Sequence, residues 1–150
     1  MKKLVLFFAL SAYIFANDDI SKLEEDCNFG NTDACVKAWL FYDSREASIG
    51  KEIKRQKQEP LFKKACDLGR GSGCSNLAAD YILYDKDYVR AIEYLEKGCS
   101  LNHPNSCGTL ADMYERGNIV LSPDKKKAKF YHKKACDLGS PLSCSALKRL

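Results

Sequence analysis

The sequence contains few histidines and no closely spaced cysteine pair, two features that many metal sites need. Only two histidines occur, His103 and His132, and no two cysteines are closer than eight positions. Zinc sites commonly use cysteine pairs with about two to four residues between them, so the cysteine pattern argues against zinc. Two distant histidines also cannot supply the ligands of a metallohydrolase centre. We therefore expect no metal and no other cofactor, and we expect His132, which lies among lysines, to be an exposed surface residue.

Beyond residue 16 the chain also lacks long apolar segments and a strong charge of either sign. Residues 4–16 are almost entirely apolar and follow two lysines, which is the arrangement of a secretory signal peptide. The segment is shorter than the about 20 residues of a membrane-spanning helix. We expect cleavage after Ala16 and a periplasmic or secreted protein. Removing Lys2 and Lys3 leaves 22 basic against 20 acidic residues, a net charge of +2, which favours neither nucleic acid nor stable membrane insertion.

The cysteines form four pairs with one internal spacing, Cys-x7-Cys. An even number of cysteines in an exported chain indicates disulfide bonds. On a straight helix, residues eight apart lie about 12 Å apart, which is too far for a disulfide. Each local pair must therefore join across a reversal of the chain. The pairs are Cys27 and Cys35, Cys66 and Cys74, Cys99 and Cys107, and Cys136 and Cys144.

Residues that end and begin helices stand between the paired cysteines. Three positions after each first cysteine is a glycine or an asparagine, the residue types that adopt the left-handed conformation at helix ends. Pro104 and Pro141 then suit the first turn of a new helix. Each disulfide is therefore expected to join the end of one helix to the start of the next. The helix-ending residues are Gly30, Gly69, Asn102 and Gly139.

Around the cysteines the sequence repeats with periods of 39, 33 and 37 residues. Apolar residues recur at steps of about three, four and seven, which indicates amphipathic helices. Such periods are typical of an all-α solenoid of stacked helix pairs. We expect Ser122 to cap a helix, Pro60 to break or start one, and Trp39 and the repeated tyrosines to pack in the core. The expected helices cover residues 18–29, 32–43, 51–68, 72–84, 87–101, 105–116, 123–138 and 141–149.

The repeat resembles a known family. The segment from Ala128 to Cys144 has the pattern Ala-x-x-Tyr-x-x-Lys-Ala-Cys-Asp-Leu-Gly-Ser-x-x-Ser-Cys and is similar to the Sel1-like repeat. The added Cys-x7-Cys pair resembles the Helicobacter cysteine-rich proteins. The resemblance implies a TPR-like superhelix of about three to four repeats, with a concave groove formed by the first helix of each pair. It also implies export, penicillin binding and weak β-lactamase activity, or an adaptor role. The expected domain is 17–150, with units near 18–43, 51–84, 87–116 and 123–149.

A serine β-lactamase needs Ser-x-x-Lys together with Ser-Asp-Asn and Lys-Thr-Gly elements. The chain has three Ser-x-x-Lys matches, beginning at Ser48, Ser122 and Ser145, and neither of the other elements. With 12 serines and 18 lysines, one or two such matches are expected by chance. The sequence therefore leaves any catalytic residue unknown.

Polar residues on the first helices, off the apolar face, are the candidates for a ligand-binding groove. Their side chains can hydrogen-bond a peptide or a carboxylate, although a solvated helix face is the simpler explanation of each of them. We expect a scaffold that binds a peptide, a peptidoglycan fragment or an envelope protein. The alternative is a penicillin-binding β-lactamase that takes β-lactams. The candidates are Asn76, Asp80, Thr109, Asp112 and Arg116.

Overall fold

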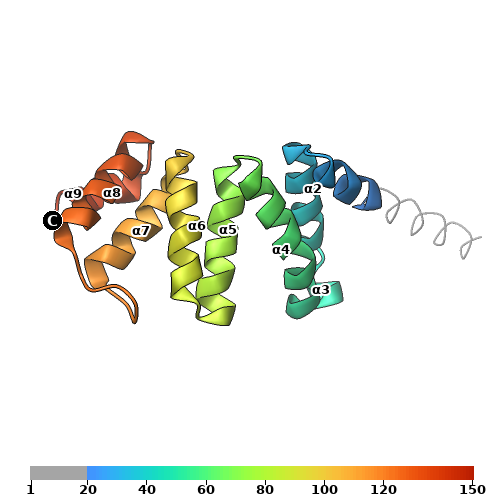
Figure 1. The fold of residues 1–150 in the computed structure, drawn as a ribbon, viewed down its shortest axis with the longest axis horizontal. Coiled ribbons are helices and arrows are strands. Elements are labelled where there is room, and N and C mark those ends of the chain that lie inside the picture. Colours follow the sequence, from blue (N-terminus) through green and yellow to red (C-terminus); the bar gives the residue numbers. More distant parts are fainter. Residues whose placement is uncertain (1–19) are drawn as a thin grey trace, which may run out of the picture. The chain divides into compact units, whose positions relative to one another are not determined.

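The computed structural model of the chain describes residues 20–150, and this part is helical with no strand (Figure 1). The predicted signal peptide, residues 1–16, lies outside the described residues. The structure divides into two compact units, whose described residues are 20–64 and 65–150, and each unit is considered separately. A helix covers residues 20–28. It is followed by α2 (Thr32–Asp43), α3 (Glu46–Ile49), α4 (Lys51–Asp67), α5 (Gly71–Asp80), the π-helical turn η1 (Tyr81–Asp85), α6 (Tyr88–Ser100), α7 (Pro104–Arg116), α8 (Lys125–Asp137) and α9 (Pro141–Leu147).

Two local expectations need correction. Pro60 neither breaks nor starts a helix, because α4 runs through it from Lys51 to Asp67. Ser122 does not cap α8. The cap is Asp124, whose carboxylate accepts hydrogen bonds from the backbone N–H groups of Lys126 and Lys127. A carboxylate two positions further along is better placed for the first turn than the hydroxyl before the proline, and its charge suits the positive end of the helix dipole.

In the first unit, Trp39 of α2 is the centre of the packing. It is 8% exposed, and its indole meets the Phe62 ring edge-on at 5.1 Å between centroids. The buried Gln58 amide donates a 2.7 Å hydrogen bond to the Trp39 carbonyl. Tyr42 donates a 2.6 Å hydrogen bond to the Glu24 carboxylate, which connects α2 to the helix before it. Trp39 and Tyr42 are thus core residues, as predicted.

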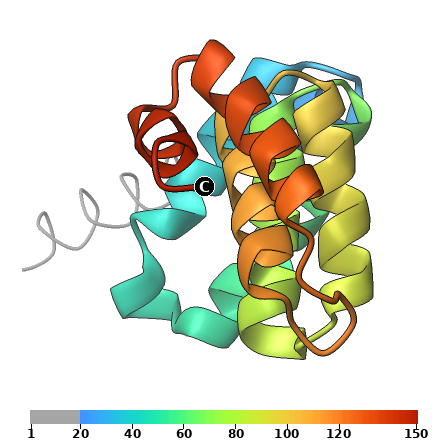
Figure 2. The same cartoon turned by 90° about the vertical axis from the view of Figure 1, so that its left-hand side faces the viewer.

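In the second unit, each helix packs against the next along the chain from α5 to α9, and α5 also contacts α7 (Figure 2). The fully buried leucines Leu77, Leu95 and Leu110 contribute to the core. Two pairs of tyrosine rings stack, one between η1 and α6 and the other between α7 and α8. Tyr81 and Tyr94 have centroids 5.6 Å apart, and Tyr114 and Tyr131 have centroids 5.7 Å apart. Tyr81 and Tyr114 are buried core residues, as predicted, whereas Tyr94 and Tyr131 are half-buried and cover them.

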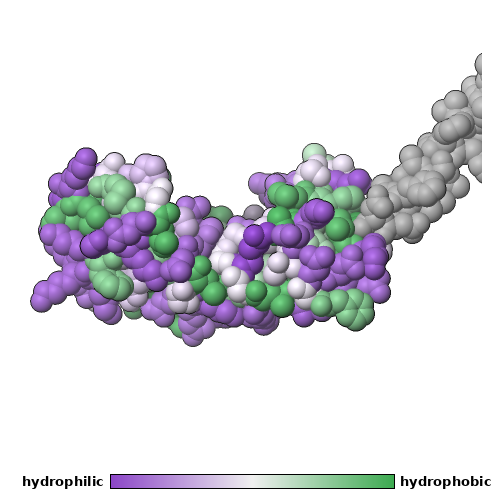
Figure 3. Space-filling model, turned by 90° about the horizontal axis from the view of Figure 1, so that it is seen from above, coloured by the Kyte–Doolittle hydropathy of each residue, from purple (hydrophilic) through white to green (hydrophobic). Residues whose placement is uncertain are grey.

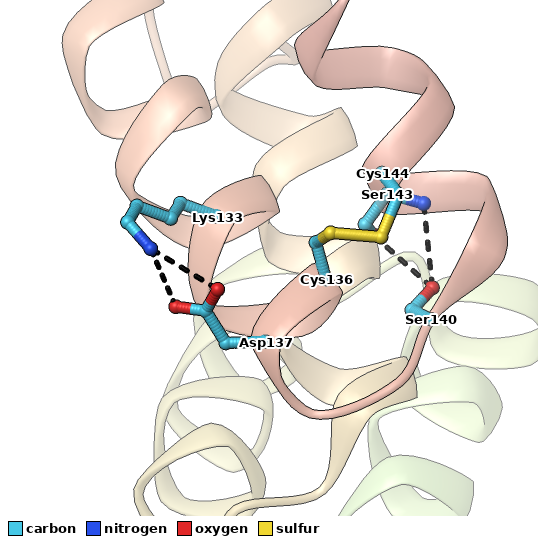
Figure 4. The surroundings of a disulfide bond; sticks show 6 residues. All are labelled: Lys133, Cys136, Asp137, Ser140, Ser143 and Cys144. Atoms are coloured by element: carbon cyan, nitrogen blue, oxygen red, sulfur yellow. Dashed lines mark hydrogen bonds and ion pairs between the residues drawn. A yellow bond between two sulfur atoms is a disulfide. The ribbon is translucent and has the colours of Figure 1, made fainter.

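All four disulfides join the predicted local pairs, with Cα atoms 4.6–4.7 Å apart. The four expected reversal residues have positive φ angles between 58° and 100°. Figure 4 shows one reversal, where the Ser140 hydroxyl accepts a hydrogen bond from the Ser143 N–H beside the Cys136–Cys144 bond. Each disulfide therefore joins a helix end to the next helix start. Among residues 20–150, no helix has the length and apolar character needed to cross a bilayer.

Candidate binding pocket

The second unit contains a pocket of about 590 Å³ on the face formed by first helices. Residues of α5, α7 and α9 line most of it, and one side chain of α8 contributes from behind. A volume of this order is typical of pockets that bind small ligands, about 300–1,000 Å³. The lining residues are Ser75, Asn105, Gly108, Thr109, Asp112, Arg116, His132, Ser140, Leu142, Ser143, Ser145, Ala146 and Arg149.

Three of the five residues predicted for a groove line this pocket. Thr109, Asp112 and Arg116 are spaced by three and four positions on α7, so they lie on one helical face. Asn76 and Asp80 lie on α5, are half-buried and are outside the pocket. Their helix contributes Ser75 instead. The structure thus brings together the α7 candidates but not the α5 candidates.

The structure corrects the expectation for His132. His132 does not lie on the surface. The residue is 2% exposed and lies on the face of α8 that packs against α7. Ala128 and Ala135, four positions before and three after, are fully buried on the same face. This spacing was the signal in the sequence for burial, but the adjacent lysines obscured it.

The His132 imidazole points at two carboxylates of α7. Its Nε2 atom lies 3.4 Å from Glu115 Oε2 and 3.6 Å from Asp112 Oδ1. Its Nδ1 atom is buried without a hydrogen-bond partner among the described residues. Asp112 is 55% exposed and Glu115 is 30% exposed at the side chain, so both carboxylates retain contact with solvent. The sequence did not indicate this cluster, because its members come from two helices.

The charged groups of the pocket include both signs. Arg116 of α7 and Arg149 near the chain end are exposed cations, and Asp112 is an exposed anion. Hydroxyls of Ser140 and Ser145 and the Asn105 amide add donors and acceptors. The exposed hydrophobic residues in the view of Figure 3 lie in separate patches among hydrophilic residues. The pocket is therefore suited to a polar ligand that carries charges of both signs.

Comparison with known proteins shows which residues form the repeats and which proteins have a similar fold. The Sel1 repeat family matches residues 73–103 and 107–140. The chain contains Sel1 repeats, and its fold is an all-α solenoid of helix pairs with four disulfides, as the sequence predicted. Helicobacter pylori cysteine rich protein B is similar in structure, with a TM-score of 0.62 and 26% identity over 88% of this chain and 94% of that chain. The resemblance to the Helicobacter cysteine-rich proteins is thereby confirmed.

Other relatives share the repeat in different settings. A Sel1 repeat protein from Oxalobacter formigenes has a TM-score of 0.70 at 19% identity, covering 88% of this chain and 98% of that chain. At this identity the likeness shows the fold alone. Cytochrome c oxidase assembly factor 7 of Xenopus tropicalis is 36% identical over 68% of this chain, and the 7A protein of Xenopus laevis is 36% identical over 43%. The chain spans less than half the length of either curated relative, 47% and 30%.

Proposed function

We propose that this Sel1-repeat scaffold is an exported binding protein whose pocket, lined by α5, α7, α8 and α9, takes a short peptide segment of an envelope protein. The observation that carries the proposal is the pocket itself, because three predicted groove residues of α7 meet α9 there. The four disulfides and the signal-like sequence at residues 1–16 support export, since disulfides persist in oxidising compartments.

A peptide suits the chemistry of the lining. Arg116 and Arg149 can pair with carboxylates, while Asp112 accepts hydrogen bonds from N–H groups. Thr109 and Asn105 can donate and accept along an extended backbone. A purely apolar ligand would leave these groups unpaired, whereas a peptide offers carboxylates to the arginines and N–H groups to Asp112. The disulfide beside α9 holds its first turn, so little ordering is required when a ligand binds.

Selection from a random peptide library on the oxidised chain tests this proposal. Enriched peptides should bind the unchanged chain in titration calorimetry and weaken roughly tenfold in Thr109→Ala or Arg116→Ala. Lys129→Ala is the matched control, because this exposed residue of α8 lies outside the pocket. Equal affinity in all three variants would place the ligand elsewhere. Binding of a peptidoglycan digest without any peptide enrichment would replace the peptide by a cell-wall fragment.

One observation favours the alternative of β-lactam hydrolysis. Ser145 is exposed and lines the pocket, and Lys148 follows it by one helical turn. Serine and lysine at this spacing could serve as nucleophile and base, although the other two elements of penicillin-recognising enzymes are missing from the sequence. The binding proposal therefore remains the stronger one.

A chromogenic cephalosporin separates the two functions. We expect no turnover by the purified chain. Turnover that follows the chain through purification, disappears in Ser145→Ala and persists in Ser122→Ala would establish the hydrolase instead. Ser122 is the matched control, because it also begins a Ser-x-x-Lys match but lies outside the pocket.

A further inference from the structure

The strongest unassigned feature of the second unit is the convergence of three ligand-type side chains at one edge of the pocket. Asp112 and Glu115 stand one helical turn apart on α7, and His132 reaches them from α8. One ligand atom from each lies within 4.8 Å of the other two. The three residues therefore present an imidazole nitrogen and two carboxylate oxygens to one point in space.

The two distances from the imidazole nitrogen to the carboxylate oxygens are those that a bound transition metal ion needs. Zn²⁺ bonds to nitrogen and oxygen are about 2.0–2.2 Å long, which places adjacent ligand atoms of a tetrahedral site about 3.4 Å apart. Nε2 of His132 is 3.4 Å from Glu115 Oε2 and 3.6 Å from Asp112 Oδ1. Small side-chain rotations of the two partly exposed carboxylates would complete the geometry. The burial of His132 fixes the ring in advance, because α7 and α8 pack around it.

We propose that Asp112, Glu115 and His132 bind a divalent first-row transition metal ion, such as Zn²⁺, with an open coordination position toward the pocket. Asp112 and His132 line the pocket, so an ion held between them is reached from that side. Three protein ligands leave a position for water or for a carboxylate of a bound ligand, as in catalytic rather than structural zinc sites. Arg116, four positions after Asp112, lies on the same face of α7 and lines the same pocket, so an anion bound in the pocket can pair with it.

The donor set selects the class of metal. One imidazole with two carboxylates suits Zn²⁺, Mn²⁺, Co²⁺ or Ni²⁺, whereas Ca²⁺ and Mg²⁺ prefer oxygen ligands throughout. The disulfides remove the competing ligands, because all eight cysteines are paired and no thiolate is free. The remaining competitors are exposed carboxylates elsewhere on the chain, which bind metal ions weakly. The affinity of the proposed site must exceed this weak binding.

Titration of the oxidised chain with Zn²⁺ in chelator-treated buffer is the first test. We expect one ion per chain, and a loss of affinity of at least about tenfold in Asp112→Asn and in Glu115→Gln. Both side chains are partly exposed, so these isosteric changes leave the core unaltered. Glu93→Gln, an exposed carboxylate of α6 outside the pocket, is the matched control and should bind like the unchanged chain.

The two histidines supply a second measurement. In an NMR titration with Zn²⁺, the imidazole resonances of His132 should shift while those of His103, the only other histidine, stay in place. Stoichiometric binding that survives in the Asp112→Asn and Glu115→Gln double variant, or an unchanged His132, would overturn the proposal. No peptide is present in either experiment, so the metal site and the proposed peptide function fail independently.

Discussion

Gly98 of α6 lies against Ser106 of α7 so closely that a side chain at position 98 would overlap the Ser106 hydroxyl. Both residues stand one position before a cysteine of the same disulfide, Cys99–Cys107. The contact thus fixes how near two successive helices come at the point where the disulfide joins them. The corresponding pairs in the neighbouring repeats are Ala65 with Gly73 and Ala135 with Ser143, again small residues.

We expect Gly98→Ala to destabilise the protein by about 1–3 kcal/mol. Alanine is intrinsically the better helix former by roughly 1 kcal/mol, but at the present separation of α6 and α7 its methyl group would overlap the fully buried Ser106. Ala135 and Ser143 show that a repeat can hold an alanine and a serine here, so the cost is that of moving α6 away from α7. Urea denaturation of the oxidised chain measures the difference. The double variant Gly98→Ala with Ser106→Gly, which copies Ala65 and Gly73, should be more stable than the sum of the two single changes allows. Strict additivity would show that the contact does not limit helix approach.

Replacing Cys99 and Cys107 together by alanine should cost about 2–5 kcal/mol. The bond closes a short loop in the unfolded chain and is buried in the folded one. Thermal unfolding under oxidising conditions measures the loss. For comparison, the chain of unchanged sequence is fully reduced. It should lose more stability than the double variant, because four disulfides are broken instead of one. Equal stability of the double variant and the unchanged chain would show that the Cys99–Cys107 disulfide does not stabilise the fold.

Non-reducing tryptic mapping should recover four local pairs with one distinctive signature. Arg70 is the only lysine or arginine between paired cysteines, so trypsin cuts inside the Cys66–Cys74 loop alone. That bond should join two peptides, while the other three bonds stay within single peptides. Any peptide that joins cysteines of different repeats, such as Cys35 and Cys66, would contradict the helix register.

Removal of the α8 cap should weaken the second unit modestly. Asp124→Ala deletes two hydrogen bonds to backbone N–H groups, and we expect a loss of about 1 kcal/mol. Ser122→Ala, two positions earlier, is the control and should change stability little, because Asp124 rather than Ser122 accepts these bonds. Urea denaturation of both variants checks the assignment. An equal or larger loss in Ser122→Ala would restore the serine as the cap.

His103 should make stability depend on pH. Its burial against Gly71 lowers the pKa of the imidazole in the folded state below the ordinary value of 6.5. As the pH falls below about 6.5, the unfolded chain therefore takes up protons that the folded chain does not, and stability declines. NMR titration should give His103 a midpoint below 6.5. His103→Asn, which keeps a good residue for a helix start, should lessen the decline between pH 7.5 and 5. A midpoint at or above 6.5 would refute the effect.

Local sequence signals predicted most of the fold. The Cys-x7-Cys spacing with a glycine or asparagine between each pair led to the chain reversals and the disulfide pairing. The spacing of the tyrosines and leucines led to the buried faces. These features depend on neighbours within one or two helical turns, so the sequence expresses them directly. Pro60 was harder to interpret, because a proline can start, break or lie within a helix, and packing around α4 determines which.

The candidate site depended far more on tertiary structure. The α7 spacing placed Thr109, Asp112 and Arg116 on one face from sequence alone. Only the packing of α8 against α7 buried His132 and aimed it at Asp112 and Glu115. Only the turn at Cys136–Cys144 brought α9 across to close the pocket. The sequence by itself determined the four chain reversals and the faces of the helices that are buried, because both depend on residues close together in the chain. Which polar groups meet was decided by the approach of neighbouring helices, which no single repeat specifies.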